Sequence, residues 1–261
     1  MNHDSAFLFP STLLGRYWTQ HARFDLLFDK DDIRKMLGRR FGSLIFLDPA
    51  VAFGPACMRA NSQEDDALTS FFLRHLHEIR SEFTVFVTTA DILQPEADEN
   101  TPVITESDDP FVQNRIKLHN EINLHFGRVL NVHLTEIAHP SPDFNPMMHS
   151  ILNPPEGTSK LPLPPLEFHQ LYFPTRIKGD VERCVPLGIS RIIPAAPPLT
   201  TTEIVKALKP ELLDRLPDPA PEDPFGSRRT SVHSFQWLDP KDGYLVSKSD
   251  QLTLLEFYYG L

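Results

Sequence analysis

Two adjacent hydroxyl side chains, Thr88 and Thr89, end an apolar run that starts at Phe83. A hydroxyl at the end of a strand can orient a carbonyl group, but it does not drive proton transfer by itself. Threonine also favours strands because of how it packs, so this pair has a purely structural explanation as well. We therefore treat Thr89 as a candidate site residue that hydrogen-bonds a ligand oxygen.

Proton transfer needs a titratable group, and several candidates lie elsewhere in the sequence. His169 and Tyr172 are spaced i and i+3, so they share a face if their segment is helical. Each candidate is also explained as a packed aromatic residue or a surface residue. The full set is Asp91, His119, His133, His149, His169 and Tyr172.

Other chemistries have no recognisable pattern. The sequence has no Gly-x-Ser-x-Gly nucleophile motif and no Gly-rich phosphate loop that ends in Lys and Ser or Thr. Cys57 and Cys184 are far apart and lack metal-ligand spacing. We therefore predict no metal site, and we expect both cysteines to be thiols of a protein in the reducing cytoplasm.

The elements around Thr89 follow from local signals. The run 83–89 is β-branched and aromatic throughout, as in a parallel strand that is buried on both faces. An acidic and polar loop follows over 93–102. Asp109 can then cap a helix whose first position is Pro110, where a missing N–H costs nothing.

This order of strand, hydroxyl pair, acidic loop and helix resembles one half of an extended short-chain dehydrogenase/reductase of the epimerase/dehydratase type. The family carries a Ser or Thr at the strand end and a Tyr-x-x-x-Lys motif on the next helix. The tyrosine transfers a proton, and the lysine lowers its pKa and holds the nicotinamide ribose. On this resemblance Thr89 keeps the hydroxyl position, whereas Phe111 stands at the tyrosine position and Arg115 at the lysine position. The resemblance implies a degenerate redox site.

The N-terminal segment carries the second part of the resemblance. A short apolar run over 6–9 precedes a turn and a helix-compatible segment over 16–22, as in the first βαβ unit of a dinucleotide-binding fold. Of the family pattern Gly-x-x-Gly-x-x-Gly only Gly15 remains, with Phe9 and Thr12 at the other two positions. We expect these side chains to crowd a diphosphate. An ordinary strand-turn-helix connection is the alternative reading.

The resemblance implies NAD or NADP as the cofactor if this loop still binds one. Asp29 ends the next strand, where an acid would bind the ribose, although it also heads an acidic run that can cap a helix over 33–38. The expected cofactor-binding residues are Ser11, Thr12, Gly15 and Asp29.

Composition limits the classes of partner. The formal net charge is −10, and no basic run is longer than two residues, so a nucleic acid is not expected. No apolar stretch reaches the roughly 20 residues that span a bilayer, so we expect no membrane partner. The 25 prolines are concentrated after residue 140, which indicates a loop-rich C-terminal region.

The predicted fold class is α/β: a Rossmann-like, doubly wound, mostly parallel sheet over 1–140, with a small Pro-rich C-terminal lobe over 141–261 packed on it as one structural unit. The segments 228–233 and 242–248 together resemble the C-terminal signature of bacterial epimerase-like proteins. Ligands of such sheets bind at the carboxyl ends of the strands. We therefore expect one crevice to be surrounded by Ser11, Asp29, Pro49, Thr89 and Arg115.

Three functions remain open. The first is a degenerate epimerase-like protein without Tyr-Lys redox catalysis that binds a nucleotide- or sugar-type ligand or acts as a partner subunit in a biosynthetic pathway. The second is an active NAD(P)-dependent epimerase, dehydratase or reductase with a relocated acid such as Tyr172. The third is a redox-free biosynthetic enzyme that reuses the cofactor crevice. The resemblance also implies a homodimer through the helices that begin near Ser62 and Phe111.

Overall fold

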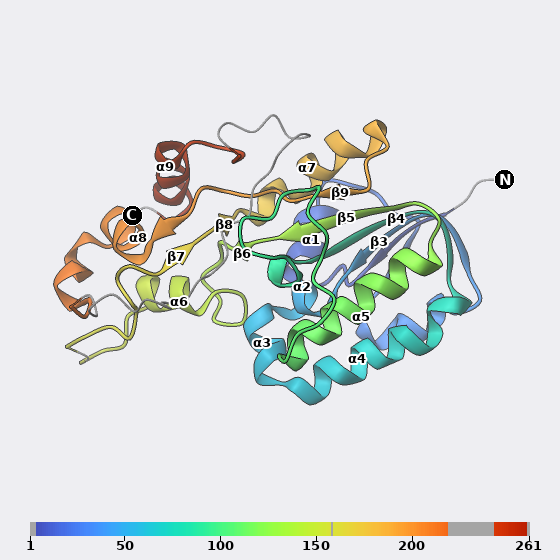
Figure 1. The fold of residues 1–261 in the computed structure, drawn as a ribbon, viewed down its shortest axis with the longest axis horizontal. Helices are drawn as coiled ribbons and strands as arrows, with labels where there is room; N and C mark the ends of the chain where they lie inside the picture. The colour runs from blue at the N-terminus through green and yellow to red at the C-terminus, as the bar shows by residue number, and fades with distance from the viewer. Residues whose placement is uncertain (1–3, 158, 219–242, 260–261) are drawn as a thin grey trace.

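The computed structural model describes residues 4–157, 159–218 and 243–259 (Figure 1). The segment 228–233, which resembles a family signature, lies outside these residues. The main layer is a six-stranded sheet in the order β2-β1-β3-β4-β5-β9, and all of its pairings are parallel. The predicted Rossmann-like α/β class is confirmed. The strands are β1 (Ser5–Leu8), β2 (Leu26–Phe28), β3 (Arg40–Leu47), β4 (Arg80–Thr89), β5 (Val129–Leu134) and β9 (Arg191–Ile192).

Helices cover the sheet and connect its strands (Figure 1). The predicted start of the long helix before β5 is confirmed, because the Asp109 carboxylate accepts from the Phe111 N–H and Pro110 occupies the first turn. The helix predicted over 33–38 is instead a 3₁₀ helix, η1 (Lys30–Met36). The helices of this layer are α1 (Leu13–Thr19), α2 (Pro49–Phe53), α3 (Pro55–Ala60), α4 (Ser62–His75), α5 (Pro110–His125) and α7 (Ile177–Cys184), with 3₁₀ turns η2 (Leu76–Glu78), η3 (Ala90–Ile92), η4 (Pro174–Arg176) and η5 (Val185–Leu187).

A second hydrophobic core lies in the C-terminal half, around Met148, Leu171 and Leu199. The lobe that holds it extends to one side of the sheet in Figure 1. The chain nevertheless returns to the sheet after residue 140, because β9 pairs with β5 and α7 contributes Ile177 to the main core. The elements of the lobe are β6 (Glu136–Ile137), β7 (Phe168–His169), β8 (Leu171–Tyr172), β10 (Leu199–Thr200), α6 (Pro146–Leu152), α8 (Thr201–Leu208), η6 (Pro210–Arg215) and α9 (Lys248–Tyr259).

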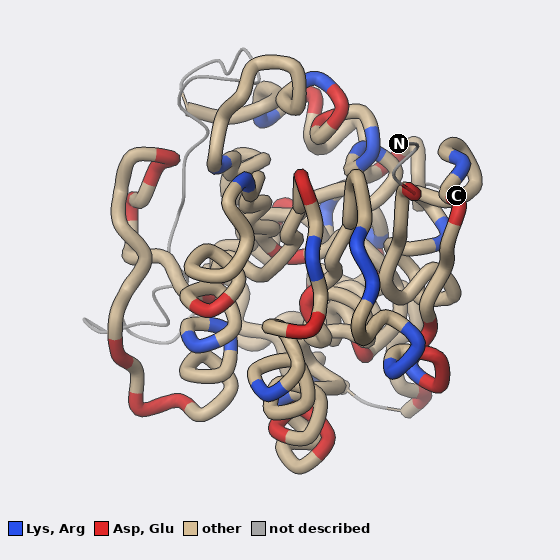
Figure 2. Tube along the Cα trace, turned by 90° about the vertical axis from the view of Figure 1, so that its right-hand side faces the viewer, with Lys and Arg blue, Asp and Glu red and all other residues tan. Residues whose placement is uncertain are grey.

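Charged residues of both signs alternate along the chain, and Figure 2 shows blue and red segments interleaved in that view. Across 4–157, 159–218 and 243–259, no helix is long and apolar enough to cross a bilayer.

Candidate functional site

A cavity of about 840 Å³ opens at the carboxyl ends of β4 and β5, where the C-terminal lobe meets the sheet. Parallel strands of this fold place their ligand sites at this edge. The sheet contributes Thr89 and Leu134, which are directly paired across β4 and β5. The other walls include Ala56, Arg59, Phe168 and Gln170. The cavity therefore has the size and position of a small-molecule site.

Two hydroxyls of the cavity wall lack partners. Thr89 and Thr135 both line the cavity, and the Oγ1 atom of each is buried without a hydrogen-bond partner among the described residues. An unpaired buried hydroxyl is costly, by about 1 to 3 kcal/mol. A ligand group that reaches either hydroxyl would offset this cost. Sequence reasoning proposed Thr89 but missed Thr135, which directly follows β5 just as Thr89 ends β4.

Arg59 and two acids form the charged part of this wall. The guanidinium of Arg59 donates to Asp91 Oδ1 at 2.9 Å and also pairs with Asp109. It lies 4.0 Å above the centre of the Phe111 ring, and Phe111 is buried. The residue at the family's tyrosine position is therefore an unreactive ring beneath a cation, and it brings no proton donor to the cavity.

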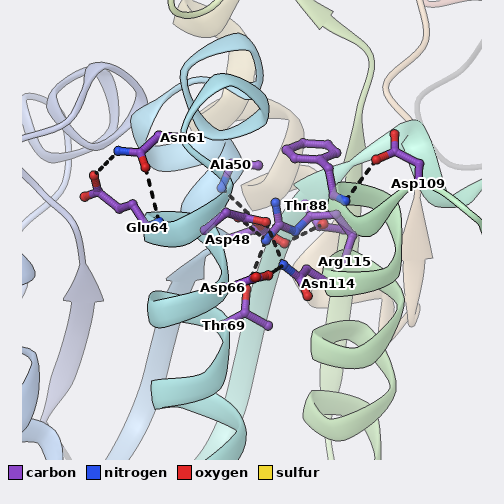
Figure 3. Close-up of polar contacts among 12 residues, drawn as sticks. Asp48, Ala50, Asn61, Glu64, Asp66, Thr69, Thr88, Asp109, Asn114 and Arg115 are labelled. Atoms are coloured by element: carbon purple, nitrogen blue, oxygen red, sulfur yellow. Dashed lines mark hydrogen bonds and ion pairs between the residues drawn. The ribbon is translucent and has the colours of Figure 1, made fainter.

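Arg115, the residue at the family's lysine position, lies in a buried network away from the cavity wall. Its side chain is 0% exposed; Nε lies 3.1 Å from Asp48 Oδ1, and Nη2 lies 2.6 Å from Asp65 Oδ1 and 3.1 Å from Thr69 Oγ1. Thr88 donates to the other Asp48 oxygen at 3.0 Å (Figure 3). Burial raises the pKa of Asp48 although the Arg115 charge opposes that shift. Arg115 thus connects α5 to α4 and to the end of β3.

Tyr172, the sequence candidate for a relocated acid, is also buried outside the cavity lining. Its hydroxyl donates to Asp180 Oδ2 at 2.9 Å. Burial and the Asp180 charge raise the pKa of Tyr172 well above its ordinary value. A phenol with a raised pKa is a weaker proton donor at neutral pH. The predicted helical face with His169 does not form, because the two residues lie on the separate short strands β7 and β8.

We expect Tyr172→Phe to lower the free energy of unfolding by about 1 to 3 kcal/mol, because the buried Asp180 loses its donor. Ligand affinity should not change, since Tyr172 does not line the cavity. Urea denaturation measures the free energy of unfolding, and calorimetric titration measures the affinity of a cavity ligand. Tyr258→Phe is the matched control: it removes an exposed hydroxyl that contacts Thr175 at 2.8 Å, and it should cost under about 0.5 kcal/mol. Loss of affinity in Tyr172→Phe would contradict the buried structural role.

The β1–α1 turn is tight, and Phe9 in it has a backbone conformation that favours glycine. Phe9, at the position of the family's first glycine, has φ of 65°, in the left-handed region that favours glycine. A Cβ atom on Gly15 would lie 2.2 Å from the Phe9 carbonyl oxygen. A side chain at position 15 would therefore clash with the backbone of the turn. Thr12, at the second glycine position, uses its hydroxyl to cap α1.

Aromatic rings and an acid occupy the surroundings of this turn. The fully buried Phe9 ring contacts Phe53 and Phe72 edge-on, with centroids 5.0 Å and 6.3 Å apart. Asp29 Oδ1 accepts from the Ser11 N–H at 3.2 Å and from its hydroxyl at 2.7 Å. The Asp29 carboxylate makes no capping bond to η1. Ser11 and Asp29 are thus brought together, whereas among the five predicted crevice residues Thr89 alone lines the cavity described above.

The remaining sequence candidates divide between core and cavity. Burial lowers the pKa of His119 to about 4 and that of the fully buried His133 well below its usual value, so both are neutral at pH 7. His149 contacts the Pro140 carbonyl oxygen at 3.0 Å. Asp91 lines the cavity.

His169 lies behind the cavity wall, where its Nδ1 is 3.0 Å from Glu136 Oε2. Glu136 itself lines the cavity, and sequence reasoning missed it. Its position just after the apolar run 129–134 was the available signal.

Comparison with known proteins places this arrangement in a fold class. No protein-family model matches the sequence, and no curated protein matches it by sequence. Solved structures do match over nearly the whole chain. A dTDP-4-dehydrorhamnose reductase from Clostridium acetobutylicum has a TM-score of 0.65 at 9% identity, with 97% of each chain covered.

Two further structures give the same result. The UDP-N-acetylglucosamine 4-epimerase from Bacillus cereus has a TM-score of 0.61 at 13% identity, with 96% of this chain and 98% of that chain covered. The Bordetella bronchiseptica enzyme WbmF, in complex with NAD⁺ and UDP, has a TM-score of 0.56 at 11% identity over 87% of this chain and 83% of that chain. The chain has the fold of the extended short-chain dehydrogenase/reductases. The predicted resemblance is confirmed at the level of fold.

Proposed function

We propose that this chain is an epimerase-like protein that binds a nucleotide- or sugar-type ligand in the cavity of β4 and β5 and does not carry out Tyr-Lys redox catalysis. The observation that carries the proposal is the contrast between two neighbouring regions. Thr89 and Thr135 line the cavity, and their buried hydroxyls have no hydrogen-bond partner among the described residues. The residues at the two catalytic positions, Phe111 and Arg115, are buried in structural contacts.

The dinucleotide region supports the same proposal. In a doubly wound sheet a dinucleotide lies at the switch point, where the strand order reverses. Here that point lies between β1 and β3, since β2 and β3 flank β1. Phe9 follows β1, Phe53 lies after β3, and their rings are in contact at 5.0 Å. The N–H of Ser11, which a phosphate would use, already binds Asp29. We therefore infer that NAD and NADP bind weakly or not at all.

The redox-free biosynthetic enzyme is the second candidate, and the cavity-lining carboxylate of Glu136 with its histidine partner favours it. An NAD(P)-dependent enzyme has support from the fold and from the cofactor of WbmF. A homodimer through α4 and α5 remains a prediction.

Calorimetric titration tests the proposal. We expect no saturable binding of NADH or NADPH below about 1 mM, and dissociation constants in the micromolar range for UDP-N-acetylglucosamine or dTDP-4-dehydrorhamnose, an affinity of roughly 6 to 8 kcal/mol. Mass spectrometry of the denatured protein identifies any ligand that co-purifies. Micromolar binding of a dinucleotide, or no binding of either nucleotide sugar, would contradict the proposal.

A matched pair of variants locates the site. Thr89→Val removes a cavity hydroxyl at nearly constant volume and should weaken nucleotide-sugar binding about 5- to 10-fold, since a hydrogen bond is worth about 1 kcal/mol. Thr84→Val removes an equally buried and unpartnered hydroxyl of the same strand that does not line the cavity. Its affinity should equal that of the unmodified protein.

A further inference from the structure

Glu136 and His169 form a carboxylate–imidazole pair at the cavity wall. Glu136 lies in β6, two residues after the end of β5; it lines the cavity, and its side chain is 22% exposed. Its Oε2 atom is 3.0 Å from His169 Nδ1. His169 is 1% exposed, so the imidazole contacts the carboxylate from within the protein. The pair is built from two elements that are distant in sequence.

A third residue fixes the orientation of the histidine. His169 Nε2 is 3.1 Å from the hydroxyl oxygen of Thr201, which is fully buried at the start of α8. With the Thr201 hydroxyl donating to Nε2, the ring carries its proton on Nδ1 and donates to Glu136. The chain Thr201–His169–Glu136 therefore holds the carboxylate in one orientation at the cavity. This is the arrangement of a positioned base supported by a buried partner.

Two hydrogen-bond donors lie on the same cavity wall. Thr135 is the chain neighbour of Glu136, and Thr89 is paired with Leu134 across the sheet. Both hydroxyls are buried and have no hydrogen-bond partner in the part of the chain that the structure describes, so each has a proton to donate to a ligand that reaches it. Donors fixed in place before the reaction stabilise negative charge that develops on such an oxygen.

We propose that Glu136 is a general base that removes a proton from the carbon next to a carbonyl group of a bound keto sugar, with Thr89 and Thr135 donating to the carbonyl oxygen. This inference rests on the proposed binding of a sugar-type ligand in the same cavity. Glu136 is the catalytic residue, and His169 is a positioning residue that acts through it.

The proton balance needs no oxidant. The carboxylate takes the proton from the carbon, and the C–H electron pair forms a carbon–carbon double bond as the carbonyl π electrons move to oxygen. The resulting enolate oxygen accepts hydrogen bonds from the two threonines. The protonated Glu136 carboxyl, after exchange of its proton with solvent, returns a proton to the same face of that carbon and restores the ketone. The net reaction is a hydrogen exchange with retention of configuration.

The test uses dTDP-4-dehydrorhamnose in D₂O, with proton NMR and mass spectrometry of the recovered sugar. We expect deuterium at a carbon adjacent to the carbonyl at least about 100-fold faster than in buffer alone. Glu136→Gln should lower that rate about 10²- to 10⁴-fold and leave the calorimetric dissociation constant within about threefold. Glu182→Gln, which removes an exposed carboxylate paired with Lys178, is the control and should exchange at the unmodified rate.

A second pair of variants tests the positioning role. Asn places an amide donor near the site of the imidazole Nδ1, whereas Gln places it near Nε2. His169→Asn should therefore keep most of the exchange rate, and His169→Gln should lose about 10- to 100-fold without a change in sugar affinity. A purely structural histidine would give equal losses in both variants.

The outcomes separate this inference from the function on which it rests. Binding of the keto sugar without exchange, or equal exchange in Glu136→Gln, overturns the base and leaves the binding function intact. Binding of UDP-N-acetylglucosamine alone overturns the keto-sugar assignment. Failure to bind either sugar overturns both the inference and the proposed function.

Discussion

Arg115→Met is expected to lower the free energy of unfolding by about 3 to 5 kcal/mol, because it leaves buried acids without their cation. The guanidinium is 0% exposed and contacts Asp48 and Asp65, which are almost fully buried. Methionine fills a similar space but cannot balance the charge. Urea denaturation at pH 7 measures the change. Arg40→Met breaks the exposed pair with Glu82 and should cost at most about 1 kcal/mol.

The loss of unfolding free energy caused by Arg115→Met should become smaller as the pH falls. Burial raises the pKa of Asp48, and loss of the arginine charge raises it further. The folded variant then binds more protons than its unfolded chain, so its stability increases from pH 8 towards pH 5. A deficit under about 1 kcal/mol, or one that grows in acid, would show that Arg115 does not balance these carboxylates.

Replacement of Phe9 should show a reversed order of stability: Phe9→Ala is expected to be less stable than Phe9→Gly. Both variants lose a fully buried ring that packs on Phe53 and Phe72, a loss of about 3 to 5 kcal/mol for an alanine replacement. The backbone has φ of 65°, and glycine alone relieves that strain, by about 1 kcal/mol. The glycine variant should therefore lose about 2 to 4 kcal/mol.

Thermal and urea denaturation of the two variants decide this point. In an ordinary buried extended position, glycine would be the worse residue, because it loses a further methyl group and has a more flexible unfolded chain. Equal stability, or a less stable glycine variant, would contradict the claim that position 9 keeps the conformation of a glycine loop.

The strand that ends at Thr89 and the start of helix α5 could be predicted from the sequence, because both depend on residues that are neighbours in the chain. The run 83–89 is apolar at every position, and Asp109 with Pro110 marks a helix start; both features are present in the fold. The helix predicted over 33–38 is the 3₁₀ helix Lys30–Met36, because an acidic run at a helix start does not distinguish the two helix types. Short local signals identify the presence of an element better than its hydrogen-bond pattern.

Which side chains meet at the site depends on contacts between residues that are far apart in the sequence. Asp65 stands in an acidic run at the start of α4, which predicts a solvated helix end, yet it is buried against Arg115, fifty residues later. Glu136 is an unremarkable acid until His169 approaches it across thirty-three positions. No periodicity encodes such pairs. Thr89 was identifiable because a strand end, a local feature, defines it.

The last strand of the main sheet has a consequence for synthesis on the ribosome. β9, at Arg191–Ile192, pairs with the outer edge of β5, more than fifty residues after β5 ends. A nascent chain that has emerged only to residue 140 therefore presents the N–H and C=O groups of that edge to other chains. The sheet acquires its protected border only when the C-terminal half arrives. A ribosome pause in this interval would lengthen the exposure of an aggregation-prone intermediate.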